Sequence, residues 1–183
     1  MKKIETSITE LFVIEPDVYG DSRGFFFEHY NEDRFKEMGI NTSFRQANHS
    51  RSLKGVLRGI HFQKDPKPMA KLVRCTFGKL WDVAVDLRPD SLTYKKWFGL
   101  ELSEDNKKML FIPEGFAHGF YSLTDCEINY MVSHVFDKDL DAGIAWNDPE
   151  IGVDWRLEGE PILSERDQNQ PLLRDILYLS SNI

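Results

Sequence analysis

Short runs of alternating apolar and polar residues dominate the chain from about residue 11 to residue 136. Gly, Pro, Asn or Asp interrupts these runs at intervals of about 8 to 12 residues, which is typical of many short antiparallel strands. The candidate strands lie at residues 24–30, 43–50, 55–62, 71–77, 79–87, 96–103, 108–113, 119–124 and 127–136. This number is enough for two facing sheets, so the pattern predicts an all-β core.

The stretch 79–87 has the clearest period of two. Its apolar face is formed by Trp81, Val83, Val85 and Leu87, and its small, acidic face by Asp82, Ala84 and Asp86. Such an acidic face fits the lined interior of an open barrel, and it fits a solvent-exposed face equally well. The strand alone leaves both alternatives open.

Helical signals are few. Residues 31–39 offer Asn31 as N-cap, acidic residues in the first turn and Gly39 as a stop. Residues 164–179 allow one or two helical turns that Pro171 interrupts. No repeat or linker divides the 183 residues, of which 41% are hydrophobic, so we expect a single domain over 1–183.

The net charge of the chain restricts the kinds of molecule that it is expected to bind. A net charge of −7 argues against non-specific binding to nucleic acid, because phosphate binding needs a basic surface. An anionic small ligand remains compatible with local positive charge. The first 16 residues read as neither a signal peptide nor a membrane span, so we expect a cytoplasmic protein. Cys75 and Cys126 lie in apolar stretches and are expected to be reduced core thiols.

The segment "GVLRGIHFQKDPKPMAKLVRC", residues 55–75, combines candidate chemistry with strand-forming residues. Its glycines suggest close approach of a ligand or of a neighbouring backbone. Arg58 has the geometry to hold a phosphate in a bidentate manner, and His61 is suited to act beside it as a base. The alternative for His61 is a hydrogen-bonded structural histidine at a strand end.

A second cluster, "FIPEGFAHGF" at residues 111–120, resembles the second signature of the cupin superfamily in its Pro113, Gly115 and His118. The first cupin signature, Gly followed after five residues by His-x-His, fits Gly55 and His61 but reads Gln63 at its last position. A Gln amide is a poor substitute for imidazole at a transition metal. We therefore expect no metal and a cupin-like jelly roll, or double-stranded β-helix, with a few short helices.

Over nearly its full length the chain resembles the dTDP-4-dehydrorhamnose 3,5-epimerases, a family of cupin-type nucleotide-sugar epimerases. The matching stretches, in family order and spacing, are "GDSRGFFFEHYN", "QANHSRSLKGVLRGIHFQ", "AKLVRC", "DVAVDLRPDSLTYKKW", "IPEGFAHGF", "GIAWNDPEIGVDW" and "LSERD". The resemblance implies epimerisation of dTDP-4-dehydro-6-deoxy-D-glucose at C3 and C5 without a cofactor. The product would be dTDP-4-dehydro-L-rhamnose.

The resemblance also implies roles for the reacting groups. His61 would be the base, Asp167 its orienting partner, Lys71 the cation beside the enolate oxygen and Tyr130 the acid on the opposite face. Each has an alternative in the residues themselves. Asp167 with Ser164 matches a helix capping box, Lys71 an exposed strand lysine and Tyr130 a core tyrosine. Turned inward, Lys71 would need a carboxylate such as Asp82.

Further residues would bind the substrate. By resemblance, Arg23 and Arg58 hold the diphosphate, and the base and sugar region is lined by Phe26, Glu28, Gln46 and Asn48. His118 would bind the sugar or shape the pocket. In the family, the strand carrying Arg23 to Glu28 is offered to the neighbouring subunit, so the resemblance implies a homodimer.

Three positions depart from the family pattern. Phe136 replaces a frequent tyrosine six residues after Tyr130, Phe62 replaces another, and Met69 replaces a frequent polar residue. A missing hydroxyl at residue 136 leaves open an enzyme that inverts only C3 or only C5 of a related nucleotide sugar. A non-catalytic sugar-binding cupin is the other alternative.

Overall fold

The computed structural model describes the backbone of residues 1–180 and the side chains of residues 1–176. The expected domain 1–183 therefore extends three residues beyond the described part. The larger sheet is six-stranded, in the order β1-β2-β10-β7-β12-β5. Its strands are β1 (Lys2–Glu5), β2 (Phe12–Glu15), β10 (Met109–Ile112), β7 (Lys71–Phe77), β12 (Cys126–Val132) and β5 (Gln46–Ser52).

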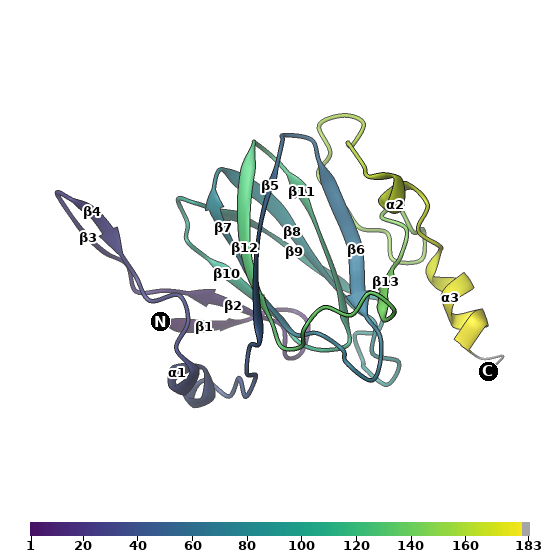
Figure 1. Ribbon diagram of the computed structural model, residues 1–183, viewed down its shortest axis with the longest axis horizontal. Coiled ribbons are helices and arrows are strands. Elements are labelled where there is room, and N and C mark those ends of the chain that lie inside the picture. Colours follow the sequence, from purple (N-terminus) through teal and green to yellow (C-terminus); the bar gives the residue numbers. More distant parts are fainter. Residues whose placement is uncertain (181–183) are drawn as a thin grey trace.

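The second sheet faces the first and has five strands, in the order β13-β6-β11-β8-β9 (Figure 1). Its strands are β13 (Asp141–Gly143), β6 (Leu57–Gln63), β11 (Phe116–Ser122), β8 (Lys79–Asp86) and β9 (Trp97–Ser103). All paired strands of both sheets are antiparallel. The expectation of an all-β, cupin-like fold is confirmed.

Strand β8 separates two apolar cores. Its packing shows whether its acidic face points into the barrel or toward solvent. Asp82 and Asp86 are fully buried, and Ala84 packs with the core cluster that contains Val73 of β7 and Phe116 of β11, so the acidic face points between the sheets. The opposite face packs against the C-terminal segment: Trp81, Val83 and Val85 contact a cluster that includes Ile144, Trp155 and Leu173. Leu87 lies beyond the end of β8.

The expected helices are present and short. Helix α1 (Glu32–Glu37) has Asn31 as its N-cap, as expected, and the buried Phe35 anchors it to the larger sheet through a cluster with Phe12 and Phe111. Near the C-terminus, α2 (Glu165–Gln168) and α3 (Leu173–Ser180) flank Pro171. No described helix has the length and apolar character needed to cross a membrane.

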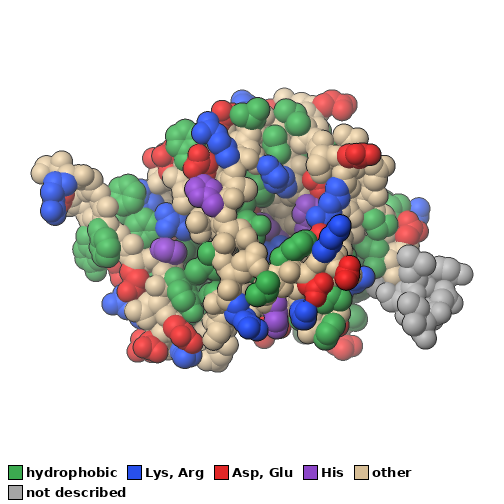
Figure 2. Space-filling model, in the orientation of Figure 1, with side chains coloured by type: hydrophobic (Ala, Val, Ile, Leu, Met, Phe, Trp, Pro, Cys, Tyr) green, Lys and Arg blue, Asp and Glu red, His purple; other side chains and the backbone are tan. Residues whose placement is uncertain are grey.

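Several strands differ from the sequence-based expectation. The strand expected at 24–30 is wrong in extent, because β4 (Gly24–Phe26) only forms a hairpin with β3 (Tyr19–Asp21). This hairpin projects from the body of the molecule as an arm (Figure 1), and Figure 2 shows hydrophobic side chains gathered along it. Strands β1, β2, β3 and β13 were not among the expected strands; each has only three or four residues, and β1 and β13 also lie outside the alternating region. Cys75 and Cys126 are buried and free, as expected.

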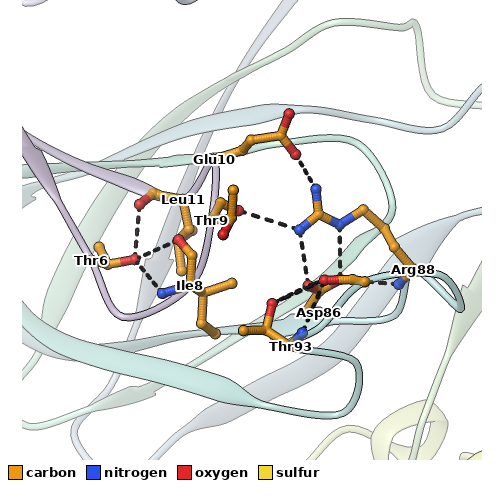
Figure 3. Close-up of polar contacts among 9 residues, drawn as sticks. Thr6, Ile8, Thr9, Glu10, Leu11, Asp86, Arg88 and Thr93 are labelled. Carbon is orange, nitrogen blue, oxygen red and sulfur yellow. Dashed lines mark hydrogen bonds and ion pairs between the residues drawn. The ribbon is translucent and has the colours of Figure 1, made fainter.

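Asp86 holds the loop after β8 to the loop before β2 (Figure 3). Its carboxylate accepts from Arg88 Nε at 2.9 Å and from the hydroxyls of Ser91 and Thr93 at 2.6 and 2.7 Å. Arg88 in turn pairs with Glu10. Burial alone would raise the pKa of Asp86, but these hydrogen bonds, with that of Arg88 the strongest, lower it to about 2. Asp86 is thus a fully bonded structural carboxylate.

Candidate active site

His61 and Asp167 form a close pair between β6 and α2. His61 Nε2 lies 2.5 Å from Asp167 Oδ1, and Asp167 is only 4% exposed. Burial would raise the pKa of Asp167, yet its hydrogen bonds, from His61 above all, outweigh burial and lower it. The ionised carboxylate accepts, so Nε2 carries the proton and Nδ1 keeps the lone pair. The ring is therefore held in the tautomer that a base requires.

Ser164 is the N-cap of α2 and also a partner of Asp167. Its hydroxyl accepts from the Asp167 amide at 3.1 Å and donates to Asp167 Oδ2 at 2.8 Å. Ser164 thus caps the helix, but the Asp167 carboxylate accepts from the Ser164 hydroxyl and from His61, with no backbone amide bonded to it in the described structure. The capping-box interpretation therefore holds for the serine only, and Asp167 is left as the partner of His61.

Lys71, the first residue of β7, brings a buried ammonium next to His61. Its Nζ donates to the backbone carbonyl of His61 at 3.4 Å. Burial lowers the pKa of Lys71 to about 8, with Asp82 the strongest of the charges that oppose the shift. The lysine thus lies inside the barrel, and the carboxylate that influences it most is the one named from the sequence.

A second histidine–carboxylate pair lies opposite the first. In the register of β6 and β11, His118 faces His61, and its Nε2 lies 2.8 Å from Asp82 Oδ1. Burial lowers the pKa of His118, although Asp82 opposes the shift. His118 is therefore neutral at physiological pH, with Nε2–H directed at the carboxylate and Nδ1 left as an acceptor.

Two adjoining cavities between the sheets bring most of the candidate residues together. One, of about 300 Å³, is lined by Arg58, His61, Lys71, His118, Tyr130 and Asp167 among others. The other, of about 320 Å³, shares His61, Lys71 and Tyr130 with the first and adds Gln46 and Asn48. Burial raises the pKa of Tyr130, so its hydroxyl is protonated at neutral pH and able to donate.

The three departures from the family pattern line one of these cavities. Phe62, Met69 and Phe136 belong to the cavity that also contains Gln46 and Asn48. The backbone amide of Phe136 donates to Gln46 Oε1 at 2.9 Å, and its side chain is 53% exposed. The three departures therefore place apolar side chains in the same cavity as Lys71.

Three candidate residues do not reach the cavities of their own chain. Arg23 lies on the projecting arm and pairs with Asp21 at 2.5 Å. Phe26 is 70% exposed on the same arm, where it lines a separate surface hollow. Glu28 pairs with Arg34 at 3.2 Å. Within one chain, the structure leaves these side chains apart from His61.

Gln63 stands where the first cupin signature has its second histidine, and both ends of its side-chain amide are already hydrogen-bonded. Gln63 Nε2 donates to the Lys67 carbonyl at 2.6 Å, and Gln63 Oε1 accepts from the Asp137 amide at 2.9 Å. Among the described residues, no group of three or more His, Cys, Asp or Glu side chains is arranged to hold a metal ion. The donor set therefore does not fit a transition metal.

Sequence reasoning missed two charged residues of the site. Arg166 and Asp141 form an ion pair of 2.8 Å between α2 and β13, and both line the cavity with His61. Arg166 lies inside the quoted stretch "LSERD", in which only its neighbour Asp167 was assigned a role. Asp141 belongs to a strand of three residues, too short to show a period of two.

Taken together, a cupin-like barrel, a histidine–carboxylate pair and a buried ammonium define a class of isomerase that deprotonates carbon beside a carbonyl. The sequence model of the dTDP-4-dehydrorhamnose 3,5-epimerases matches residues 5–175. The chain belongs to this family of nucleotide-sugar epimerases.

Individual relatives agree with this assignment. The dTDP-4-dehydrorhamnose 3,5-epimerase of Methanothermobacter thermautotrophicus is 49% identical over 180 residues, which cover 96% of this chain and 97% of the relative. The crystal structure of a Legionella pneumophila 3,5-epimerase in complex with dTDP-4-keto-L-rhamnose is 42% identical, with a TM-score of 0.92, and covers 94% of this chain and 93% of that one. A dTDP-4-dehydrorhamnose 3-epimerase of Streptomyces niveus is 39% identical and covers 92% of this chain and 82% of the relative.

Proposed function

We propose that this protein epimerises dTDP-4-dehydro-6-deoxy-D-glucose at C3 and C5 and so forms dTDP-4-dehydro-L-rhamnose. The observation that carries the proposal is the pair of His61 and Asp167 at 2.5 Å, with the buried Lys71 bonded to the His61 backbone in the same cavity. Both C3 and C5 are adjacent to the C4 ketone, so their hydrogens are acidic enough for an imidazole base when the enolate is stabilised.

In the proposed reaction, His61 Nδ1 removes the proton from C3 or C5. The C–H electron pair forms a carbon–carbon double bond, and the carbonyl electrons move to O4. Lys71 stabilises the negative oxygen, and Asp167 stabilises the imidazolium. Tyr130 returns a proton to the carbon from the other face, which inverts that centre. Solvent then removes the proton from His61 and reprotonates Tyr130.

Other residues would hold the nucleotide. Arg58 lines the cavity beside His61 and is held by Ser52 Oγ, which accepts from its Nε at 2.9 Å. A guanidinium held in this way suits a diphosphate. Gln46 and Asn48, joined by a hydrogen bond of 2.8 Å, line the neighbouring cavity and suit the base and sugar. His118 offers its free Nδ1 to a sugar hydroxyl.

We also propose a homodimer in which the arm reaches the neighbouring subunit. Arg23 and Phe26 lie on the arm, Glu28 follows it, and none of the three lines the cavities of its own chain. The exposed Tyr19 and Phe25 of the arm, at 66% and 61%, are suited to burial against a partner. Sedimentation should show a dimer. Two buried free cysteines fit a reducing cytoplasm, where we place the enzyme.

Solvent exchange tests the reaction directly. The protein is incubated with dTDP-4-dehydro-6-deoxy-D-glucose in heavy water, and proton NMR follows both positions. We expect deuterium at C3 and at C5. Exchange at one position only would establish the single-centre alternative, and the Phe136→Tyr variant would then show whether the missing hydroxyl is the cause. Thermal stabilisation by the nucleotide sugar without any exchange would establish a non-catalytic binding protein.

A further inference from the structure

Asp82 is buried with only half of its hydrogen-bonding capacity used. It is fully buried in the middle of β8, and its Oδ1 accepts from His118 at 2.8 Å. Its Oδ2 has no hydrogen-bond partner and is shielded from solvent. A carboxylate left in this state is costly, and such exceptions call for an explanation in a function.

Asp86 shows that the same strand can satisfy a buried carboxylate completely. It lies four residues along on the same face of β8 and is equally inaccessible. Arg88 and Thr93, seen in Figure 3, saturate both of its oxygens together with Ser91. The incomplete bonding of Asp82 is therefore not a general consequence of this strand.

The charge of Asp82 acts on the buried ammonium of Lys71. Attraction by Asp82 of β8 and Asp141 of β13 favours the ammonium, and repulsion by Arg166 of α2 disfavours it. His61 of β6, His118 of β11 and Tyr130 of β12 line the same cavity as Lys71. Asp82 is the strongest favourable charge in this set, and it also fixes the tautomer of His118.

We propose that Asp82 is a positioning residue, which acts through Lys71 and His118 without touching the substrate. This role rests on the proposed epimerase function. The free charge of its Oδ2 keeps the buried ammonium of Lys71 protonated beside the enolate oxygen. Its bonded Oδ1 holds the His118 ring with Nδ1 as acceptor. If Lys71 donated to both oxygens of Asp82, its ammonium would be occupied by the carboxylate. Because Asp82 Oδ2 accepts no hydrogen bond, the ammonium remains available to the substrate.

The test is the pH profile of kcat/KM, which reports groups of the free enzyme. Lys71 has a pKa of about 8, so the wild type should lose activity as the pH rises through this value. Asp82→Asn keeps the volume and the acceptor for His118 but removes the charge. In this variant, kcat/KM should begin to fall at a pH that is lower by about one unit or more. For a shift of one unit this corresponds to about a fivefold drop at pH 8 and about a tenfold drop well above pH 8.

Asp86→Asn is the matched control, since it removes an equally buried carboxylate from the same face. It should lower thermal stability and leave the alkaline part of the profile unchanged. An unchanged profile in folded Asp82→Asn would overturn the role of Asp82. If Asp82→Asn does not fold, Asp82→Ser, also uncharged, is tested for the same two outcomes.

A readout independent of turnover separates this inference from the proposed function. In protein labelled with carbon-13 lysine, NMR should show one lysine that titrates near pH 8, and Asp82→Asn should move that titration downward. An enzyme with no solvent exchange but with this shift would contradict the epimerase function and retain the link between Asp82 and Lys71. Exchange without the shift would contradict only the link.

Discussion

Ser164 and Asp167 bond each other in both directions: the serine hydroxyl accepts from the Asp167 amide at 3.1 Å and donates to Asp167 Oδ2 at 2.8 Å. The same hydroxyl therefore starts α2 and orients the carboxylate that holds His61. Structural and functional demands meet at one side chain.

Ser164→Ala should consequently lower both stability and activity. Loss of an N-cap hydroxyl costs about 1 kcal/mol in unfolding free energy. Loss of orientation at Asp167 should reduce kcat by about tenfold or more, with little change in KM. Thr6→Val is a suitable control, since Thr6 lines neither cavity and its hydroxyl bonds the backbone of Ile8 and Leu11 (Figure 3). Equal loss of activity in both variants would contradict the role of Ser164.

His61→Ala and Asp167→Asn should abolish solvent exchange at C3 and C5 while the proteins remain folded. A positioned base contributes about 100- to 10,000-fold to the rate. In Asp167→Asn the amide would donate to the ring and favour the wrong tautomer. Circular dichroism verifies the fold, and heavy-water NMR measures exchange. Substantial exchange in folded His61→Ala would show that another group is the base.

Lys71→Ala should lower kcat by about 100-fold or more, as expected for loss of a group that stabilises a developing oxyanion. Its effect on KM should be smaller, because the ammonium acts on the enolate more than on the bound ketone. Lys108→Ala, which removes an ammonium paired with Glu15 on another strand, should leave both constants unchanged. If KM alone changes, Lys71 is a binding residue.

Asp86 should make the stability of the protein depend on acidic pH. Its pKa of about 2 in the folded state lies below the ordinary value of 3.8, so its contribution is complete above pH 4. As the pH falls from 4 toward 2, a contribution of about 2 kcal/mol is lost. Urea unfolding of the wild type should reveal this loss. In Asp86→Asn the curve should be lower at pH 7 and flatter below pH 4; parallel curves would contradict the assignment.

The sequence allowed the strands to be predicted where alternation was strong, as in 71–77 and 79–87, because burial of one face imposes a period of two. It could not decide which face of β8 points inward, since both are buried, one by the facing sheet and one by the C-terminal segment. That segment lacks regular periodicity, so its packing on Trp81 and Val83 was not foreseen.

The residues of the candidate site likewise fall into those that the sequence indicated and those that only the structure revealed. Local stretches with a matching pattern, around His61, Lys71 and His118, pointed to the cavity. The ion pair of Asp141 and Arg166, the pair of Asp82 and His118, and the bonds that occupy Gln63 all join residues distant in sequence. Such contacts arise only from tertiary packing and leave no periodic signal in the chain.

Because β8 is covered on both sides, the candidate site depends on both layers that pack against it. Two opposed sheets alone would already present the imidazole and the ammonium to each other. The carboxylate of Asp167 is supplied by the C-terminal segment, which packs on the reverse side of β8 at Trp81, Val83 and Val85. A chain truncated before this segment would therefore keep His61 and Lys71 but lack the carboxylate partner of His61.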